Sequence, residues 1–318
     1  MKWLKKGKIF SPVNNIPSHC MGFAQGPQAI ELDDRVRVYF STRELDMHNK
    51  YLSHVSYVDF DKTFSSVLHI NKKTILPLGT SGTFDEHGIF PFHPFIINNK
   101  IYGYTTGWNR KVSVSADASI GLVVSQDNGD SFERLGDGPI LGACLHEPFL
   151  IGDPFVLQHK KVFHMWYIYG VKWLTKADTL ENERVYKITH ATSADGVNWK
   201  RESSPIIDDR MLESECQAMP TIFQHKDQFH MYFCYRSAFD FRRNKDCGYK
   251  IGYAYSDNLV DWVRDDRLSG IDLSKQGWDS EMMCYPNIIT INHRVYMLYN
   301  GNEFGKNGFG VAELIGEK

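Results

Sequence analysis

Residues 152–170, GDPFVLQHKKVFHMWYIYG, hold the pattern that decides the fold. A proline follows a short polar lead-in and opens an apolar run. A polar turn at His159-Lys160 and a second strand rich in aromatic residues come next. The pattern occurs five times in all, and the steps between successive prolines are 67, 60, 66 and 66 residues. Self-similarity at a nearly fixed period indicates a repeat architecture. The five prolines are Pro27, Pro94, Pro154, Pro220 and Pro286.

Two further strands complete each unit. The segments 119–135, 188–202 and 251–265 alternate apolar residues, then form a Ser-x-Asp or Ser-Asp turn, and then reach an aromatic residue that begins the outer strand (Phe132, Trp199 or Trp262). Unit one carries a degenerate copy at 54–64. Four strands per unit arranged radially form a β-propeller. The sequence therefore predicts an all-β, five-bladed β-propeller with about four strands per blade.

The last unit stops after a single further strand, 308–315, so the N-terminal segment 3–10 is expected to supply its missing outer strand. This pairing would close the ring and remove its edges. The whole chain, residues 1–318, is then one domain. A chain of this length could also form two ordinary domains, and the repeat favours one.

Composition limits the classes of function. The chain has 318 residues, 42% of them hydrophobic, and a net charge of −2, which offers no electrostatic basis for binding nucleic acid. No apolar stretch approaches the roughly 20 residues that span a bilayer, and the N-terminus has no apolar signal core. Six cysteines without framework spacing indicate reduced thiols. We therefore expect a cytoplasmic protein without a membrane span, and leave its oligomeric state open.

Carboxylates recur close to the prolines. They are Asp153 in unit three, Glu215 in unit four, and Asp279 and Glu281 in unit five. The innermost strands of a propeller line a central channel, so residues at their starts rim one mouth of it. Carboxylates that converge there repel one another, which raises the pKa of some and leaves others ionised. Glycoside hydrolysis needs this combination, so these four residues are the candidate catalytic residues.

Two short motifs carry a resemblance to a known group. IGDPF (151–155) and SEC (214–216) resemble motifs of the five-bladed glycoside hydrolases of the arabinanase/xylosidase and invertase/levansucrase type. The resemblance implies that Asp153 stabilises the transition state and that Glu215 is the general acid. The segments GDPF, ECQAMP, GWDSEM and LYNGN are more similar to bacterial glycosidase-like propeller proteins encoded beside surface-polysaccharide genes. That resemblance implies a role in sugar metabolism, and biosynthesis rather than digestion.

The chain departs from those enzymes in unit one, where their nucleophile or base is an Asp and this sequence has Gln25-Gly26. Ala218 also occupies the position of the invertase-type acid, because Glu215 lies five residues before Pro220 rather than two. If the protein is a hydrolase, we expect Glu215 as the acid, Asp279 or Glu281 as the base, and Asp153 as the residue that orients and tunes the acid. Otherwise ordinary glycosidase chemistry is absent.

Other residues near the expected funnel are candidates for substrate binding. Arg43 and Arg236 end the second strands of units one and four; they can clamp a carboxylate or phosphate, or pair with an acid of a neighbouring blade. Trp108 and Trp173 can stack on a sugar or pack in the core. The basic cluster at 242–245 is interpreted as a solvated hairpin tip. The remaining candidates are Gln25, His87, His93, Gln217, Tyr285 and Asn300.

No cofactor and no metal are expected, because His87, His93 and His146 lack the spacing of metal ligands. Two classes of function stay open. One is a carbohydrate-active enzyme that cleaves or transfers a glycosyl unit of a small sugar, anionic or linked to a nucleotide or phosphate. The other is a non-catalytic propeller that binds a glycan or a protein. Carboxylates from three units at one mouth favour the enzyme, and the missing unit-one Asp counts against it.

Overall fold

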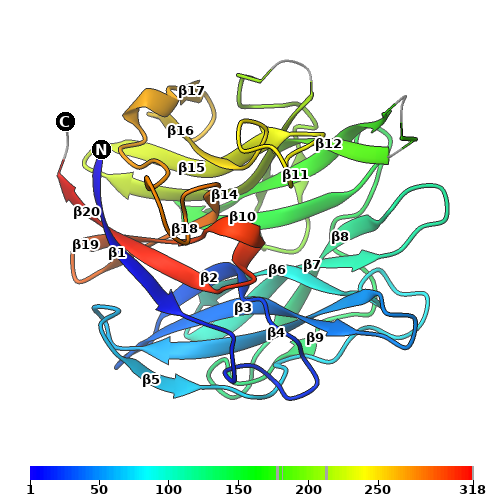
Figure 1. The fold of residues 1–318 in the computed structure, drawn as a ribbon, viewed down its shortest axis with the longest axis horizontal. Coiled ribbons are helices and arrows are strands. Elements are labelled where there is room, and N and C mark those ends of the chain that lie inside the picture. Colours follow the sequence, from blue (N-terminus) through cyan, green and yellow to red (C-terminus); the bar gives the residue numbers. More distant parts are fainter. Residues whose placement is uncertain (177–178, 181, 212–213, 317–318) are drawn as a thin grey trace.

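The computed structural model describes residues 1–176, 179–180, 182–211 and 214–316, and its ordered elements are almost all β-strands (Figure 1). The strands form antiparallel meanders within four sheets. The largest sheet contains two meanders joined through a single parallel pair, Ser53 with Gly88. Its strands are β2 (Gln25–Glu31), β3 (Val36–Leu45), β4 (Tyr51–Phe60), β5 (Val67–Ile70), β6 (Gly88–Ile97), β7 (Lys100–Asn109), β8 (Asp117–Val124) and β9 (Glu133–Arg134).

The other three sheets have four strands each. Short 3-10 turns, η2 (Asp266–Leu268) and η3 (Asn302–Gly305), lie in the connections. The second sheet contains β10 (Ile151–His159), β11 (Val162–Thr175), β12 (Asn182–Ser193) and β13 (Lys200–Arg201). The third contains β14 (Glu215–His225), β15 (Gln228–Ser237), β16 (Lys250–Ser256) and β17 (Val263–Arg264). The last contains β18 (Cys284–Ile291), β19 (Arg294–Asn300), β20 (Phe309–Gly316) and β1 (Lys2–Phe10).

The first strands of the five meanders surround the centre of the molecule. β2 contacts β6, β6 contacts β10, β10 contacts β14, β14 contacts β18, and β18 contacts β2 (Figure 1). The contacts therefore return to their starting strand. These five are called the inner strands below.

Hydrogen bonds join the inner strands through a buried polar set, Gln28, His93, Thr221 and Asn287, which we call the inner belt. Asn287 Oδ1 accepts from the Ala29 N–H at 2.9 Å, Thr221 Oγ1 from the Ile288 N–H at 3.0 Å, and His93 Nε2 from the Val156 N–H at 3.1 Å. Gln28 Oε1 lies 3.2 Å from His93 Nδ1. Each side chain thus fastens one inner strand to the next. Burial lowers the pKa of His93 to about 4, so its imidazole is neutral and its role is structural.

Every inner strand carries a β-bulge at its proline. In four of them the residue before the proline has a positive φ: Gly26, Asp153, Met219 and Tyr285. The fifth bulge lies between Ile89 and Phe92, at Phe90-Pro91. The prediction that Pro94 is the repeat proline of unit two is therefore wrong; the proline at the equivalent bulge is Pro91. His93 then lies beyond the bulge, which explains its place in the inner belt.

The predicted turns are present with local adjustments. Two-residue hairpin turns with positive φ at both positions join β6 to β7 at Asn98-Asn99 and β18 to β19 at Asn292-His293. Such φ values match the right-handed twist of hairpins. The corresponding turn between β10 and β11 is Lys160-Lys161, one residue later than expected. The aromatic residues Phe132, Trp199 and Trp262 directly precede β9, β13 and β17 and pack on the core, as predicted.

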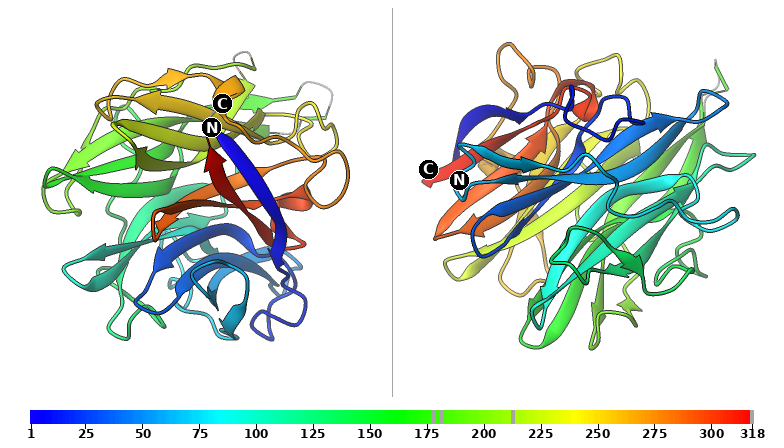
Figure 2. Two further views of the ribbon diagram at one scale, coloured as in Figure 1. Left: turned by 90° about the vertical axis from the view of Figure 1, so that its left-hand side faces the viewer. Right: turned by 90° about the horizontal axis from the view of Figure 1, so that it is seen from below.

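The N-terminal strand completes the last sheet. β1 pairs antiparallel with β20, with Lys2 opposite Gly316, so the N-terminus lies beside the end of β20 (Figure 2). Trp3 is buried, and its Nε1 donates to the Tyr232 hydroxyl at 2.9 Å, which ties β1 to the third sheet as well. The expected pairing of segment 3–10 with the last strand of the chain is confirmed. Within the described residues, no helix has the length and apolar character required to cross a bilayer.

Candidate functional site

A cavity of about 560 Å³ opens where the five inner strands begin. Each of these strands contributes a lining residue near its start: Gln25, Phe90, Asp153, Ala218 and Tyr285. Aromatic side chains form much of the wall. They are Phe23, Tyr51, Phe90, Trp108, Tyr186, Phe241, Tyr249, Tyr285 and Phe304.

Asp153 is the buried carboxyl group of this cavity; only 8% of the residue is exposed. Its backbone N–H donates to Thr106 Oγ1 at 2.8 Å, and its Oδ2 accepts from the Met219 N–H at 3.1 Å. The second bond joins β10 to β14, and with the inner belt it completes the links around the centre. Burial raises the pKa of Asp153 to about 7, against the opposing effects of the Met219 N–H and of the Arg184 charge. Near neutral pH, Asp153 can therefore hold a proton.

Arg43 lies two residues before the end of β3 and lines the cavity. Its Nε donates to Gln25 Oε1 at 2.8 Å, and its Nη1 donates to Ser53 Oγ. The guanidinium carbon lies 5.5 Å from the centre of the Phe90 ring. Burial lowers the pKa of Arg43 to about 10, so it is still charged at neutral pH. Within the described residues Arg43 has no ion pair with a carboxylate.

Arg236 occupies the equivalent place on β15, as predicted, since Ser41 and Cys234 pair with Gln25 and Ala218 in matching registers. It is 1% exposed, and its Nη1 donates to the carbonyls of Ser237 and Ala238. The guanidinium carbon lies 3.6 Å from the centre of the Phe241 ring, while the buried Nε has no hydrogen-bond partner. No carboxylate of the described chain neutralises this cation.

Two further arginines line the cavity. Arg184, at the start of β12, donates to Ser115 Oγ at 3.2 Å and likewise has no carboxylate ion pair in the described ranges. Arg242 pairs with Glu183 at 3.2 Å. The carboxylates among the described lining residues are Asp153 and, half-buried beside Lys111, Asp117. The cavity therefore carries more positive than negative charge.

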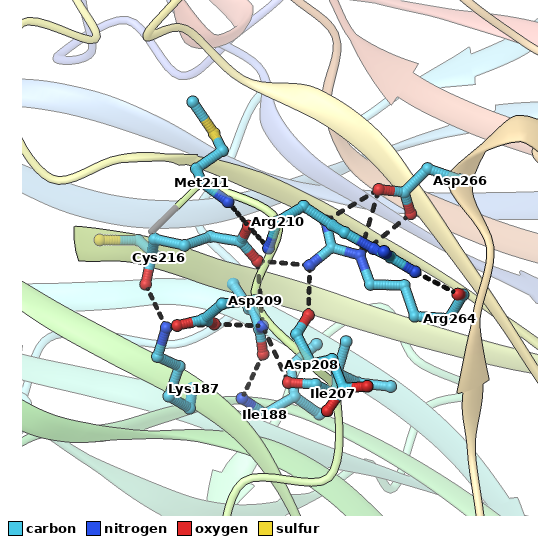
Figure 3. A network of polar contacts seen from close by, with 12 residues as sticks. Lys187, Ile188, Ile207, Asp208, Asp209, Arg210, Met211, Cys216, Arg264 and Asp266 are labelled. Atoms are coloured by element: carbon cyan, nitrogen blue, oxygen red, sulfur yellow. Dashed lines mark hydrogen bonds and ion pairs between the residues drawn. The ribbon is translucent and has the colours of Figure 1, made fainter. Parts of the chain in front are cut away.

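Glu215 lies outside the cavity lining. It is fully buried and ion-paired with Arg264, and its Oε2 accepts from the N–H groups of Arg210 and Met211 (Figure 3). Gln217 belongs to the same network: its Nε2 donates to Glu215 Oε1 and to the Ile207 carbonyl. The structure therefore places neither Glu215 nor Gln217 among the residues that line the cavity with Asp153. Their contacts are those of a network that fixes the 207–211 segment.

The unit-five carboxylates also lie away from the cavity. Asp279 is 2% exposed, accepts from Lys5 Nζ at 2.7 Å and from the Tyr299 hydroxyl at 3.1 Å, and so anchors β1. Glu281 is exposed, and its backbone N–H donates to Asn302 Oδ1. The expected convergence of four carboxylates is thus not present among the cavity residues.

The remaining candidates divide between lining and support. Gln25, Trp108 and Tyr285 line the cavity, whereas Trp173 packs against the core on β11. His87 is not a lining residue, and its ring stacks on Trp108 at 5.8 Å. His93 belongs to the inner belt. Asn300 is buried and is not a lining residue; its Oδ1 accepts from the Gly26 N–H and its Nδ2 donates to the Ala24 carbonyl.

Sequence reasoning missed several lining residues. Arg184 and Tyr186 lie near the start of β12, and Tyr249 just precedes β16, so third strands also reach the cavity. Arg242 comes from the basic cluster that was interpreted as a solvated tip; it is exposed, as expected, but it also lines the cavity, with its guanidinium carbon 4.1 Å from the centre of the Phe241 ring. A signal existed in the repeated position of Tyr186 and Tyr249, whose hydroxyls lie 3.0 Å apart.

Comparison with solved structures identifies the class of fold. A glycoside hydrolase superposes with a TM-score of 0.73 over 99% of this chain and 92% of its own, at 17% identity. An exo-1,5-α-L-arabinanase from a bovine ruminal metagenomic library gives 0.64, over 95% and 96%, at 12% identity. A structure from the GH130 family of mannoside phosphorylases, which contains glycoside hydrolases that target β-1,2 mannosidic linkages in Candida mannan, gives 0.68, over 98% and 93%, at 13% identity. The chain has the fold of glycoside-hydrolase-like propellers.

Comparison of sequences identifies the family. The uncharacterised proteins MT1551 and Rv1502, from two strains of Mycobacterium tuberculosis, are each 30% identical to this chain over 316 residues. The matched residues cover 99% of this chain and 99% of each relative. The chain belongs to the same family as these mycobacterial proteins. No family model matches the sequence.

Proposed function

We propose that the protein is a carbohydrate-active enzyme that cleaves or transfers the glycosidic bond of a small anionic sugar, of the kind used in surface glycans. It would work as a single five-bladed propeller, in which the two meanders of the largest sheet count as separate blades. The observation that carries the proposal is the composition of the cavity. One buried carboxyl group with a pKa of about 7 shares an aromatic cavity with three arginines that have no carboxylate partner in the described chain.

The three arginines indicate an anionic ligand. Arg236 is buried, and Arg43 and Arg184 are half-buried. A cation withdrawn from water without a counter-ion costs free energy that a bound anion can recover. Arg43 and Arg236 can each present a planar fork to a carboxylate or a phosphate. The aromatic wall suits the apolar C–H faces of a sugar ring. The substrate would therefore be a uronic-acid-like or phosphorylated sugar, including a sugar linked to a nucleotide.

Asp153 is the proton donor in this proposal. It would give its proton to the glycosidic oxygen as the bond from that oxygen to the anomeric carbon breaks. This assignment replaces Glu215 as the acid, because Glu215 is ion-paired with Arg264 and lies outside the cavity lining. The resulting Asp153 carboxylate would stand near Arg184, whose charge already acts on it.

The attacking group can be water or phosphate. Water must lose a proton as it attacks, and Asp117 is the second lining carboxylate that could accept it. A phosphate dianion needs no base, because its oxygen is already nucleophilic, and the arginines could hold it. The likeness to the mannoside phosphorylase family is one of fold, and it makes phosphorolysis worth a separate arm of the test.

The test is a panel of neutral glycosides, uronides and sugar phosphates, each incubated with the full-length protein with and without inorganic phosphate. We expect turnover of anionic members, with a free sugar as product if water attacks and a glycosyl phosphate if phosphate attacks. Asp153→Asn should lower the rate by about 10²–10⁴-fold. Arg236→Lys should weaken binding about tenfold or more, because Lys cannot form the fork.

Glu281→Gln is the matched control, since Glu281 is an exposed carboxylate outside the cavity lining and should leave the rate unchanged. Turnover that survives in Asp153→Asn would refute the proton donor. Anionic sugars that raise the melting temperature without being converted would establish the alternative, a glycan-binding propeller. Equal response to neutral and anionic sugars would contradict the role of the arginines.

A further inference from the structure

A group of three metal-ligand side chains lies outside the cavity. His19, Glu44 and His54 each offer a ligand atom, and these atoms all lie within 4.8 Å of one another. His54 Nε2 is 2.6 Å from Glu44 Oε2, and the rings of His19 and His54 stand perpendicular with their centres 5.1 Å apart. Two imidazoles and one carboxylate are a common ligand set for zinc.

The fold brings the three residues together from separate segments. His54 on β4 pairs directly with Thr42 on β3, so the two side chains share a face of the sheet. Glu44 lies two residues beyond Thr42 and therefore projects from that same face. His19 comes from the segment 11–24, which is fastened to β3 where the Met21 N–H donates to the Arg43 carbonyl and Thr42 Oγ1 donates to the Gly22 carbonyl.

The polar contacts of this group are incomplete in the described protein. His54 is 8% exposed, and its Nδ1 is a buried atom with no hydrogen-bond partner. The nitrogen that faces Glu44 is Nε2, and Nδ1 points away from Glu44 on the other edge of the ring. Buried polar atoms are nearly always paired, so Nδ1 is expected to bind a water when Nε2 binds an ion. Glu44 has no ion pair with a lysine or arginine among the described residues; its ion-pair partner is His54. No fixed cation therefore competes for its carboxylate.

We propose that His19, Glu44 and His54 bind one divalent transition-metal ion, Zn²⁺ in the first instance, with the remaining coordination position open to water. This departs from the expectation of no metal. The ion would fasten the segment 11–24 to β3 and β4. Phe23, within this segment, and Gln25, directly after it, line the cavity, so the ion would act as a positioning site for that edge. The inference does not depend on the proposed enzymatic activity.

The test uses the full-length protein, stripped with a chelator and titrated with Zn²⁺ by calorimetry. We expect one equivalent of Zn²⁺ per chain, a raised melting temperature, and a visible absorption band when Co²⁺ replaces Zn²⁺. His19→Ala should lower the affinity for Zn²⁺ at least about tenfold, because loss of even an outer-shell partner of a metal ligand lowers affinity by about 10–100-fold. Because His19 is exposed, this variant should still fold.

His48→Ala is the matched control: it removes an exposed histidine from the neighbouring β3–β4 connection and should bind like the parent. Glu44→Gln should also lose affinity while keeping a hydrogen bond to His54. No bound Zn²⁺ or Co²⁺ in the stripped and reloaded protein would overturn the proposal. It would equally be overturned if His19→Ala and the parent bound alike, or if His48→Ala lost as much affinity as His19→Ala, which would indicate adventitious surface binding.

Discussion

At the scale of the residue, Asp153 combines two roles that can be separated. The φ of Asp153 is positive, at 52°, and φ is also positive at Gly26, Met219 and Tyr285 in the equivalent bulges. The positive φ is therefore a feature of the repeat and not of catalysis. The raised pKa of Asp153, in contrast, comes from its own burial in the cavity. A carboxyl group whose folded pKa exceeds its ordinary value of 3.8 contributes stability that is fully present below pH 3.8 and is lost as pH rises through about 7.

Asp153→Asn should therefore stabilise the protein at pH 8, because the neutral amide avoids the burial of a charge while still accepting from the Met219 N–H. The gain has an upper limit of about 4 kcal/mol, from about 1.4 kcal/mol for each unit of a shift of roughly three. The difference should shrink toward zero near pH 4, where the parent carboxyl is protonated. Urea unfolding of parent and variant at pH 8, pH 6 and pH 4 measures this trend. A variant less stable than the parent at pH 8 would show that Asp153 is held as a carboxylate.

Glu215 illustrates the opposite case, a buried carboxylate with a fixed partner. Glu215→Gln leaves the Arg264 guanidinium with one carboxylate partner, Asp266, and should destabilise the protein by about 3–5 kcal/mol, as expected when a buried ion pair loses one member. The folded fraction should keep the activity of the parent. Chemical unfolding together with specific activity per folded molecule separates these effects. Loss of activity without loss of stability would restore Glu215 as the acid.

At the scale of the element, removing β1 tests whether this strand is needed to complete the last sheet. Deletion of residues 1–10 removes the ladder to β20, the buried Trp3 and the Lys5 partner of Asp279. The variant should give little soluble protein. The milder Trp3→Ala should cost about 3–5 kcal/mol through the cavity that it leaves. Leu4→Ala is the control, since Leu4 is 46% exposed on the same strand. A truncated chain with the parent's melting temperature would contradict a closing role for β1.

The element scale also shows which parts of the fold were open to prediction. The strand repeat, the outer aromatic residues and the role of β1 follow from periodicity, because alternation and turn residues are local signals. The bulge of β6 did not follow, since Pro91 and Pro94 both stand in an apolar run three residues apart. Only the pairing of Phe92 with Thr105 distinguishes them. This three-residue error moved His93 from the inner belt to the expected site.

Alternation explains why Glu215 is not among the residues that line the cavity. Ala218 lines the cavity, and Glu215 lies three residues before it on the same strand, so their side chains project from opposite faces. The number of residues between a carboxylate and the proline was a poor guide to the cavity lining, because the face of the strand from which the side chain projects matters as much as its position along the strand. The metal-ligand group was beyond sequence reasoning for a different reason. His19 reaches Glu44 and His54 only through the path of the 11–24 segment, which no spacing rule predicts.

At the scale of the whole molecule, the five inner strands are joined by a continuous set of side-chain hydrogen bonds. Gln28 links β2 to β6, His93 links β6 to β10, Asp153 links β10 to β14, Thr221 links β14 to β18, and Asn287 links β18 back to β2. No sheet can separate without breaking two of these links. We therefore expect residues 1–318 to unfold as one domain.

Asn287→Ala tests this cooperative unit at the contact that closes it. The change leaves the half-buried Ala29 N–H without its acceptor and removes a buried partner of Gln28, which should cost about 1–3 kcal/mol. If the ring is a single unit, far-UV circular dichroism and tryptophan fluorescence should report one shared transition in parent and variant, shifted to lower denaturant in the variant. The exposed Asn307→Ala should change stability by no more than about 0.5 kcal/mol. Two separate transitions, with only one moved by Asn287→Ala, would mean that the sheets unfold independently and that the inner belt does not join them into one domain.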